Sequence, residues 1–515
     1  MAGARKAAWI GIAGAIACAF VSCSHEWDAY DPRLGSATSG GGAGLGGGST
    51  VSEASAGGAG PASSSSASTT GAGGTGGVGG AGGSPEPGSV HCAAHFPAVS
   101  SYLRHVMVDP AGGIVVVGPI QGDTDFGGGV LTAPVGRDSA AIAKLDSDCK
   151  HLWSKAFPAS VNKTYFWSAA MWPSGDVAAV GGIDGAVDFG GGTLTPVGNE
   201  DTVVVRFDPA GNHVWSQSYG LAGAGQWPQS AAIDGSGDVL VFGVSYGGAD
   251  FGGTPFVGNG VFLAKLSGTT GAPIWFKAFP SPSSRASSVA VDGSGGILLT
   301  GQFAGTIDFG GVMLAATGTA RDGFVVKLDA AGDTVWARRF GSATGTVADY
   351  GHAVAPIGAG DVALTGRFDE TLAFDSGPVT SAGDRDIFLT RLDASGTSSW
   401  TKRFGGASFD SALGLVVDAS SNIVLAGRFE GTTDLGGVAL VAEDKADAFV
   451  ARYDGAGNHL WSRRFGGLGY ESASAVSVDA AGRIVVTGYF DGVLDVGDRS
   501  FTATGYDGFV LVLWP

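Results

Sequence analysis

Charge is scarce in this chain, and basic charge is the scarcer sign. Charged residues make up 15% of the 515 positions, where about 25% is typical of soluble proteins. The 47 acidic residues outnumber the 29 basic ones, which gives a net charge of −18. Because nucleic-acid binding requires a basic surface, the composition excludes a nucleic-acid partner. An anionic membrane surface would also repel the body of the protein.

Long hydrophobic runs and metal-binding motifs are missing as well. The apolar segment at residues 7–22 has sixteen residues, fewer than the ~20 that a transmembrane helix needs. HExxH and CxxC do not occur. The string GVSYG (243–247) has G-x-S-x-G spacing, but it falls at the end of a predicted strand with no helix after it, whereas a nucleophile elbow needs both. We therefore expect no catalytic residue, metal or cofactor, and a protein that is not an enzyme.

Glycine, by contrast, is abundant. The chain has 92 glycines, and 71 of them lie outside residues 31–90, so the excess is distributed along the length. Interior glycine destabilises a helix by up to about 1 kcal/mol relative to alanine, and the three-residue period of collagen is absent. These features predict a β protein with dozens of turns.

The N-terminus has the features of an export signal. Arg5 and Lys6 precede the apolar segment, and Cys23 follows it. The stretch FVSC (20–23) resembles a bacterial lipobox, which implies a signal peptide over 1–22 and lipidation at Cys23. Cys18 is an alternative processing site, and cleavage of an ordinary secretory signal is a third possibility. Ser24 after the cysteine resembles the outer-membrane sorting signal of enteric bacteria, so the membrane is expected to be contacted only through the N-terminal lipid.

Residues 23–89 form a low-complexity segment rich in Gly, Ser and Ala. With so few apolar side chains, the segment cannot bury enough surface to offset the entropy of ordering. We expect a disordered tether between the lipid and a folded domain over 90–515.

The folded domain is a repeat of about sixty residues. One marker is a tryptophan near the end of each unit, found at Trp153, Trp215, Trp275, Trp336, Trp400 and Trp461. A second is a DFGG-type turn, which begins at Asp125, Asp188, Asp250 and Asp308, degrades to AFD at 373–375, and recurs at Asp434 and Asp495. Alternating apolar residues and D-x-x-G turns divide each unit into four strands, a to d.

Seven units of four strands predict an all-β fold, a seven-bladed β-propeller. The chain ends on a strand c (DGFVLVLWP) with no strand d after it, while VHCAAHFP (90–97) aligns with the strand d HLWSKAFP (151–158). The N-terminal strand is therefore expected to complete the last blade and close the ring. The tryptophans are expected to pack against the neighbouring blade.

These repeats resemble the bacterial seven-bladed propeller repeat family often abbreviated SBBP, as in DASSNIVLAGRF (418–429) and DAFVARYDGAGNHLWSRRFGG (447–467). The resemblance implies an exported or surface protein and leaves its role undefined. We expect a non-enzymatic binding or scaffold module, monomeric, whose partner is a protein or glycan of the cell envelope. Two alternatives are a propeller lipoprotein of outer-membrane assembly and a quinoprotein-like enzyme. The segment LSGTTGAPIW (266–275) is the part of the chain most similar to the quinoprotein repeat.

Two groups of candidate site residues follow from the repeat alignment. Cys92 and Cys149, the only cysteines beyond the signal region, are a candidate disulfide at the ring closure. On the face that carries the long b–c and d–a loops, aromatic and acidic side chains begin strand a, and we expect a binding rim there. The alternative is that the rings only pack beneath the d–a loops. The predicted rim comprises Tyr102, Tyr165, Trp227, Tyr350, Asp349, Asp410 and Glu471.

Overall fold

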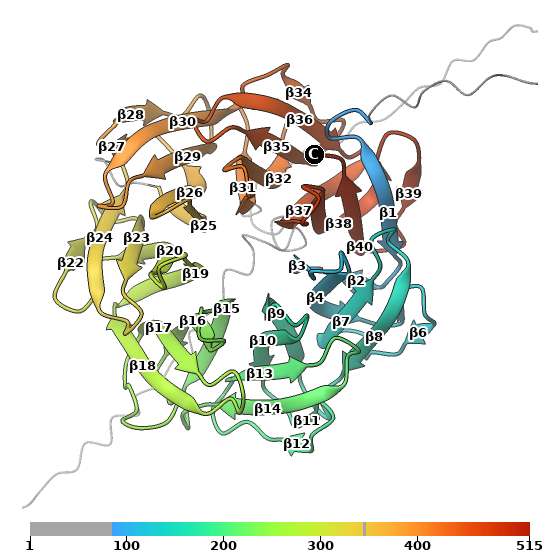
Figure 1. Ribbon diagram of the computed structural model, residues 1–515, viewed down its shortest axis with the longest axis vertical. Coiled ribbons are helices and arrows are strands. Elements are labelled where there is room, and N and C mark those ends of the chain that lie inside the picture. Colours follow the sequence, from blue (N-terminus) through green and yellow to red (C-terminus); the bar gives the residue numbers. More distant parts are fainter. Residues whose placement is uncertain (1–84, 343–346) are drawn as a thin grey trace, which may run out of the picture. The chain divides into compact units, whose positions relative to one another are not determined.

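In the computed structural model, which describes residues 85–342 and 347–515, the chain folds into a ring of seven four-stranded antiparallel sheets (Figure 1). Every regular element of the described residues is a strand. The prediction of a seven-bladed β-propeller is confirmed. No helix long and apolar enough to cross a membrane occurs among the described residues.

Strand a of each blade borders the centre of the ring, and strand b follows it outward. The a strands are β2 (Ser100–Ser101) with β3 (His105–Val108), β9 (Thr164–Met171), β15 (Gly225–Ile233), β19 (Ser283–Val291), β25 (Tyr350–Ile357), β31 (Asp410–Val417) and β37 (Gly469–Val478). The b strands are β4 (Ile114–Gln121), β10 (Val177–Ile183), β16 (Val239–Tyr246), β20 (Ile297–Ala304), β26 (Asp361–Phe368), β32 (Ile423–Phe429) and β38 (Ile484–Asp495). Neighbouring a strands contact one another around the ring.

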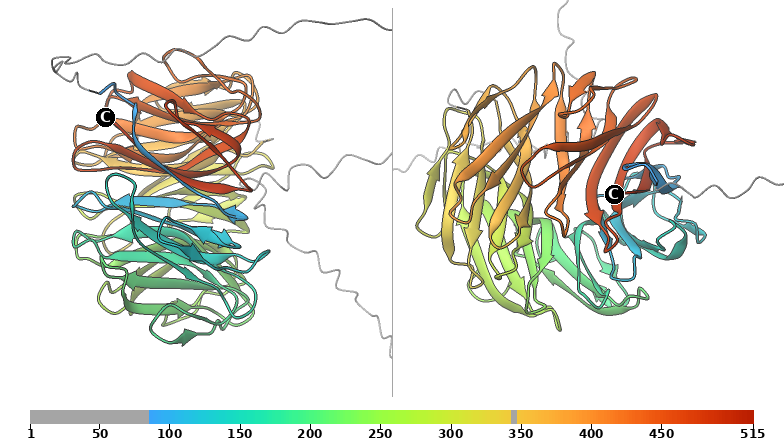
Figure 2. Two further views of the ribbon diagram at one scale, coloured as in Figure 1. Left: turned by 90° about the vertical axis from the view of Figure 1, so that its right-hand side faces the viewer. Right: turned by 45° about the horizontal axis from the view of Figure 1, so that its top comes forward.

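Strand c is third and strand d is the outer edge. The c strands are β7 (Ser139–Leu145), β13 (Asp201–Phe207), β17 (Gly260–Leu266), β23 (Asp322–Leu328), β29 (Asp386–Leu392), β35 (Asp447–Tyr453) and β40 (Asp507–Leu513). The d strands are β8 (His151–Phe157), β14 (His213–Tyr219), β18 (Pro273–Pro280), β24 (Thr334–Phe340), β30 (Ser398–Gly406), β36 (His459–Phe465) and β1 (Val90–Phe96). Figure 2 shows the ring from its edge, with the sheets of neighbouring blades face to face.

Short strands in the b–c loops make up the remainder. They are β5 (Thr124–Asp125), β6 (Val130–Leu131), β11 (Val187–Asp188), β12 (Thr193–Leu194), β21 (Thr306–Asp308), β22 (Met313–Ala315), β27 (Thr371–Phe374), β28 (Gly377–Thr380), β33 (Thr432–Asp434), β34 (Leu440–Val441) and β39 (Ser500–Thr502). Most of them pair as hairpins whose two strands are connected by the DFGG-type turn, while β39 pairs with the extended β38.

The ring closes where the sequence predicted. Strand β1 pairs antiparallel with β40, with Phe96 opposite Gly508 and Val90 opposite Leu513. Residues 86–89 already contact the propeller, a few residues before the predicted boundary at 90. Gly88 N donates to Trp514 O at 2.9 Å, and Trp514 N donates to Ser89 O at 3.0 Å. The two ends of the described chain thus join to form the c–d turn that the other six blades have within one segment.

The repeated tryptophan joins each blade to the next. Trp336 Nε1 on β24 donates to Ala394 O in the c–d turn of the following blade, at 3.0 Å. A Cβ built on Gly396 of that turn would lie 2.8 Å from the Trp336 ring, and Gly396 has a φ of +80°, so glycine is required there. Gly88 meets Trp461 in the same way, with a φ of +74°. The predicted packing of the tryptophans against the next blade is confirmed.

The DFGG-type turn provides a second contact between blades. Its phenylalanine is buried and packs on the aromatic residue at the end of strand d of the preceding blade, as Phe309 does on Phe279, with ring centroids 4.9 Å apart. The same contact recurs for Phe96–Phe126, Phe157–Phe189, Tyr219–Phe251 and Phe340–Phe374. Both sequence markers are therefore inter-blade contacts.

Candidate functional site

Every a strand from blade 2 to blade 7 contains a β-bulge near its start. In β9, for example, Phe166 lies opposite Gly181 and Ser168 opposite Val180, so Trp167 is the extra residue of the bulge. The other bulge residues are Gln229, Ser287, His352, Leu413 and Ser474. Because bulges redirect a side chain and often lie beside functional sites, the start of the a strands is the candidate location of a site.

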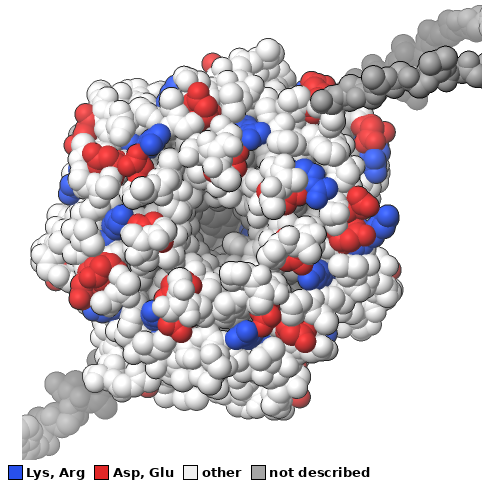
Figure 3. Space-filling model, in the orientation of Figure 1, with Lys and Arg blue, Asp and Glu red and all other residues white. Residues whose placement is uncertain are grey.

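Figure 3 shows one face of the ring, with a hollow at its centre and acidic and basic side chains interspersed around it. Acidic and basic side chains of one blade often form ion pairs with each other. Lys327 Nζ lies 2.8 Å from Asp292 Oδ2, and Arg391 Nη2 lies 2.7 Å from Asp361 Oδ2. Asp292 lies in an a–b turn, Asp361 begins strand b directly after one, and both bases are on strand c. These pairs therefore belong to the face with the short turns.

The acidic part of the predicted rim is wrong. Asp349, Asp410 and Glu471 are each 0% exposed and accept hydrogen bonds from backbone N–H groups of the preceding d–a loops. The donors are Ser342 N at 2.9 Å, Gly406 N at 2.8 Å and Gly467 N at 3.3 Å. A carboxylate that holds a loop from beneath is not available to a ligand.

Burial also determines the protonation of these acids. It raises the pKa of both Asp349 and Asp410 to about 7, in spite of the backbone hydrogen bonds that each accepts. Burial likewise raises the pKa of Glu471 to about 9, with the nearby Asp447 adding to the effect. All three therefore bind a proton far more tightly than an exposed carboxylate does.

The aromatic part of the predicted rim divides into two pairs. Tyr102 and Tyr165 are buried, at 5% and 2% exposure. Tyr102 packs edge-on to Tyr489, and the Tyr165 hydroxyl donates to Glu200 Oε1. These two rings follow the alternative interpretation, in which the aromatics only pack beneath the loops.

Trp227 and Tyr350 are partly exposed. Trp227 packs edge-on to Tyr246, with centroids 4.8 Å apart, and Tyr350 stacks on His352 at 5.6 Å. The guanidinium carbon of Arg367 lies 4.1 Å from the Tyr350 centroid. The structure therefore leaves two of the four predicted aromatics within reach of a ligand.

Arginines of blades 5 and 6 are the residues that the sequence analysis missed. The guanidinium carbons of Arg367, Arg385 and Arg428 lie 5.2, 5.8 and 4.9 Å from the ring centroid of Phe409. Arg367 and Arg428 are the second-to-last residues of β26 and β32. Arg385 immediately precedes β29, and Phe409 immediately precedes β31. We call these four residues the Phe409 cluster. It lies at the long-loop face, where strands b end and strands a and c begin.

The charges of the cluster act on the titratable groups around it. Burial, followed by the charges of Arg367 and Arg428, lowers the pKa of His352 well below its usual range, so the imidazole is neutral. Burial alone would raise the pKa of the Tyr350 phenol, but the charge and hydrogen bond of Arg367, with Arg285 and Gln302, lower it. Burial, together with the charge of Asp384, raises the pKa of Glu430, although the charge of Arg428 opposes this shift.

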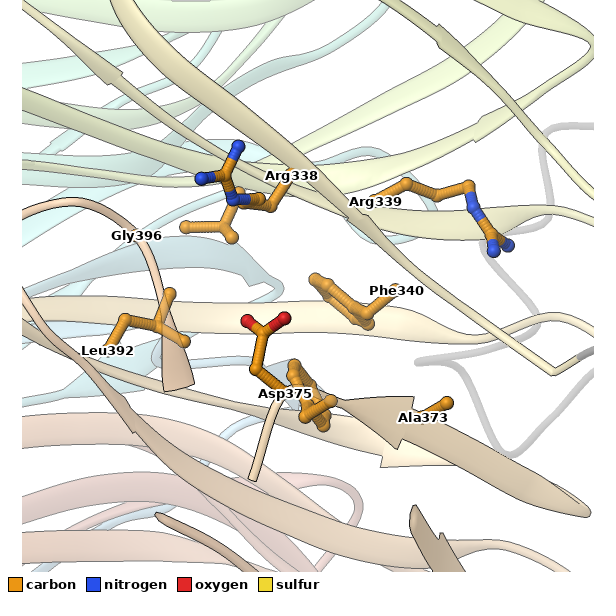
Figure 4. A pocket seen from close by; sticks show the side chains of 9 residues that line it. Arg338, Arg339, Phe340, Ala373, Asp375, Leu392 and Gly396 are labelled. Carbon is orange, nitrogen blue, oxygen red and sulfur yellow. The ribbon is translucent and has the colours of Figure 1, made fainter. Parts of the chain in front are cut away.

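A pocket of about 300 Å³ lies at the outer part of the ring, between β24 and β27 (Figure 4). Asp375 lines it in the position of the first DFGG glycine of other blades. Its arginines are engaged by the protein itself: Arg339 Nη1 is 2.5 Å from Asp322 Oδ2, and Arg338 Nη2 donates to Ser395 O at 3.2 Å. The pocket therefore offers a ligand less unsatisfied charge than the Phe409 cluster does.

Cys92 and Cys149 form a disulfide, with their Cα atoms 6.0 Å apart. Cys92 occupies the position of the tryptophan on β1, and Cys149 occupies the position of the turn glycine in blade 1, with a φ of +62°. The disulfide therefore replaces the Trp–Gly contact at the ring closure.

The remaining candidate residues are the serine of the G-x-S-x-G string, possible metal ligands and the N-terminal cysteines. Ser245 of the GVSYG string is buried within β16. No group of three or more His, Cys, Asp or Glu side chains suited to a metal occurs in the part of the chain that the structure describes. Cys18, Cys23, the signal segment and nearly all of the predicted tether lie outside the described residues.

Comparisons with known proteins add little beyond the fold. No protein-family model matches the chain. A mimivirus protein named "Uncharacterized WD repeat-containing protein L264", from Acanthamoeba polyphaga mimivirus, is 28% identical over 119 residues, which is 21% of this chain and only 8% of that protein.

Several solved structures resemble the chain at low identity. The Dos1 propeller is 9% identical with a TM-score of 0.41, covering 83% of this chain and 95% of that one. Quinohemoprotein alcohol dehydrogenase from Comamonas testosteroni is 11% identical with a TM-score of 0.38, covering 82% and 76%. Virginiamycin B lyase from Staphylococcus aureus is 8% identical with a TM-score of 0.40, covering 82% and 99%. The strands of the chain itself define its class, a seven-bladed β-propeller.

Proposed function

We propose that this protein is an exported lipoprotein, anchored through Cys23, whose propeller is a non-enzymatic binding module for an envelope glycan or protein. Residues 1–22 would be the signal peptide and the segment to about residue 85 the tether. The observation that carries the binding role is the Phe409 cluster with Tyr350 and Trp227: partly exposed rings and guanidinium groups gather at one mouth of a rigid ring. Binding residues are commonly held on loops over such a scaffold.

The binding role is tested by removing the exposed rings. We expect a Trp227→Ala/Tyr350→Ala/Phe409→Ala variant of the full chain to lose binding to a panel of immobilised glycans and envelope proteins that retains the unmodified chain. Lys150→Ala, at an exposed position in a c–d turn of the opposite face, is the control and should bind normally. A thermal melt shows whether the triple variant folds. A folded variant that binds as well as the control would refute the role of this face.

The lipid anchor and the cellular location are tested in cells. Cys23→Ala should move the protein from the membrane fraction to the soluble fraction, since one acyl-anchored cysteine is its expected attachment. Protease added to intact cells should digest a surface propeller and spare a periplasmic one. Membrane attachment unchanged by the substitution would contradict lipidation at Cys23. Protection together with copurification of a β-barrel insertase would favour the assembly role, and quinone absorbance would favour an enzyme.

A further inference from the structure

The Phe409 cluster concentrates positive charge in a protein of net charge −18. Several other bases of the same two blades are paired with acids: Arg391 with Asp361, Arg403 with Asp386 and Arg464 with Asp447. Neither Arg367 nor Arg385 forms an ion pair with any carboxylate of residues 85–342 or 347–515. The cluster is therefore an exception to the pairing that prevails around the ring.

Burial makes the charge of Arg367 unfavourable in the absence of an ion-pair partner. Its side chain is 3% exposed, and its buried Nε has no hydrogen-bond partner among the described residues. Removing a charge from water is unfavourable unless an opposite charge and hydrogen bonds compensate. The ring faces of Tyr350 and Phe409 and the hydrogen bond to the Tyr350 hydroxyl compensate only in part, because cation–π contacts and bonds to a neutral group are weaker than ion pairs with good geometry. A bound anion would supply the missing partner.

The arrangement also restricts the kind of anion. Guanidinium groups bind carboxylates in a two-pronged geometry, and here they surround a partly exposed aromatic ring at 4.9–5.8 Å. A uronic acid carries a carboxylate directly on a rigid sugar ring whose C–H face can pack on an aromatic side chain. One such sugar matches both elements at once. An acidic peptide, in contrast, would separate its carboxylates from any surface that suits Phe409.

Resting on the binding role proposed above, we propose that the Phe409 cluster binds an acidic glycan, with a carboxylate of the glycan held by the partly exposed Arg385 beside the buried charge of Arg367, and a sugar ring packed against Phe409. Arg428, between Phe409 and Tyr470, extends the positive charge toward the next blade. The ligand is thus a glycan of charged sugars rather than neutral ones.

Calorimetric titration of the full chain tests this site. The probes are an oligogalacturonate, the same oligosaccharide with its carboxylates reduced to alcohols, a sulfated oligosaccharide and an oligoglutamate peptide. We expect the oligogalacturonate to bind at least about tenfold more tightly than the reduced form, with an affinity that falls as salt is added.

Substitutions assign the binding to the cluster. Arg385→Gln and Phe409→Leu should each weaken oligogalacturonate binding about tenfold or more. Arg338→Gln removes the same charge from an exposed position on strand d and should stay within about twofold of the unmodified chain. Thermal melts of all three variants show that the fold is retained.

Each outcome decides between the two proposals. Equal affinity for the acidic and reduced oligosaccharides overturns the acidic-glycan site and leaves the binding role intact. Preference for oligoglutamate overturns the glycan assignment in favour of a protein ligand. Tighter binding of the sulfated probe keeps the anion site but assigns it to sulfate instead of carboxylate. Absence of binding to all four probes overturns this inference, while the panel experiment decides the binding role separately.

Discussion

At the scale of single residues, Asp410 shows how burial changes the chemistry of an acid. Its carboxyl accepts a hydrogen bond from Gly406 N, and burial raises its pKa to about 7, against about 3.9 for an unfolded chain. Between these values the folded protein holds a proton that the unfolded chain has lost. The contribution to stability is therefore present at about pH 4 and disappears as the pH rises through about 7.

We predict that Asp410→Asn makes the protein less sensitive to pH in this window. The amide has no proton to lose, and its oxygen can still accept from Gly406 N. Melting temperatures measured from pH 4 to pH 8 should fall less steeply for the variant than for the unmodified protein. At pH 8 the variant should be at least as stable.

Asp292 supplies a matched control of opposite sign. Burial alone would raise its pKa, but Lys327, the hydroxyl of Ser294 and backbone N–H groups lower it to about 2. Its stabilisation is present above about pH 4 and lost as the pH falls through about 2. Asp292→Asn should therefore destabilise the protein at pH 8. Equal losses for both variants at pH 8 would contradict our account of Asp410.

At the scale of the elements, the sequence predicts what recurs in every blade. The tryptophan of strand d and the phenylalanine of the DFGG-type turn repeat because each makes the same contact with a neighbouring blade, seen in Trp336 on Gly396 and Phe309 on Phe279. An interaction that the fold repeats leaves a pattern that a single chain reveals. Strand order and the closing strand β1 could be predicted for that reason.

What differs between blades could not be predicted as well. The repeat alignment places Asp410 at the start of strand a, but it does not show that a d–a loop lies over the carboxylate. The Phe409 cluster had a signal: Gly-Arg-Phe at 366–368 and 427–429 stands where other blades have Gly-Gln-Phe (301–303) or Gly-Tyr-Phe (488–490). Its meaning depends on Arg385 and Phe409, which only the folded ring brings to the same place.

At the scale of the whole molecule, ring closure is the step that no single blade provides. Six junctions between blades join a tryptophan to a turn glycine within continuous sequence or, at Gly88, across the two ends of the described chain. The seventh, between β1 and the c–d turn of blade 1, has the Cys92–Cys149 disulfide in place of that contact. Dissociation of β1 from β40 would open the ring, and the disulfide links β1 covalently to the c–d turn of blade 1.

We predict that Cys92→Ser/Cys149→Ser lowers the free energy of unfolding by about 4 kcal/mol, the value expected for a cross-link across some sixty residues. The sequence separation here is 57. Reduction of the unmodified protein should have a similar effect in denaturant titrations. The replacement Cys92→Trp/Cys149→Gly restores the contact of the other junctions, so it should recover part of the loss and become insensitive to reductant. If the reduced protein unfolds at the same denaturant concentration as the oxidised one, β1 is held by its pairing with β40 alone, and the disulfide is not what keeps the ring closed.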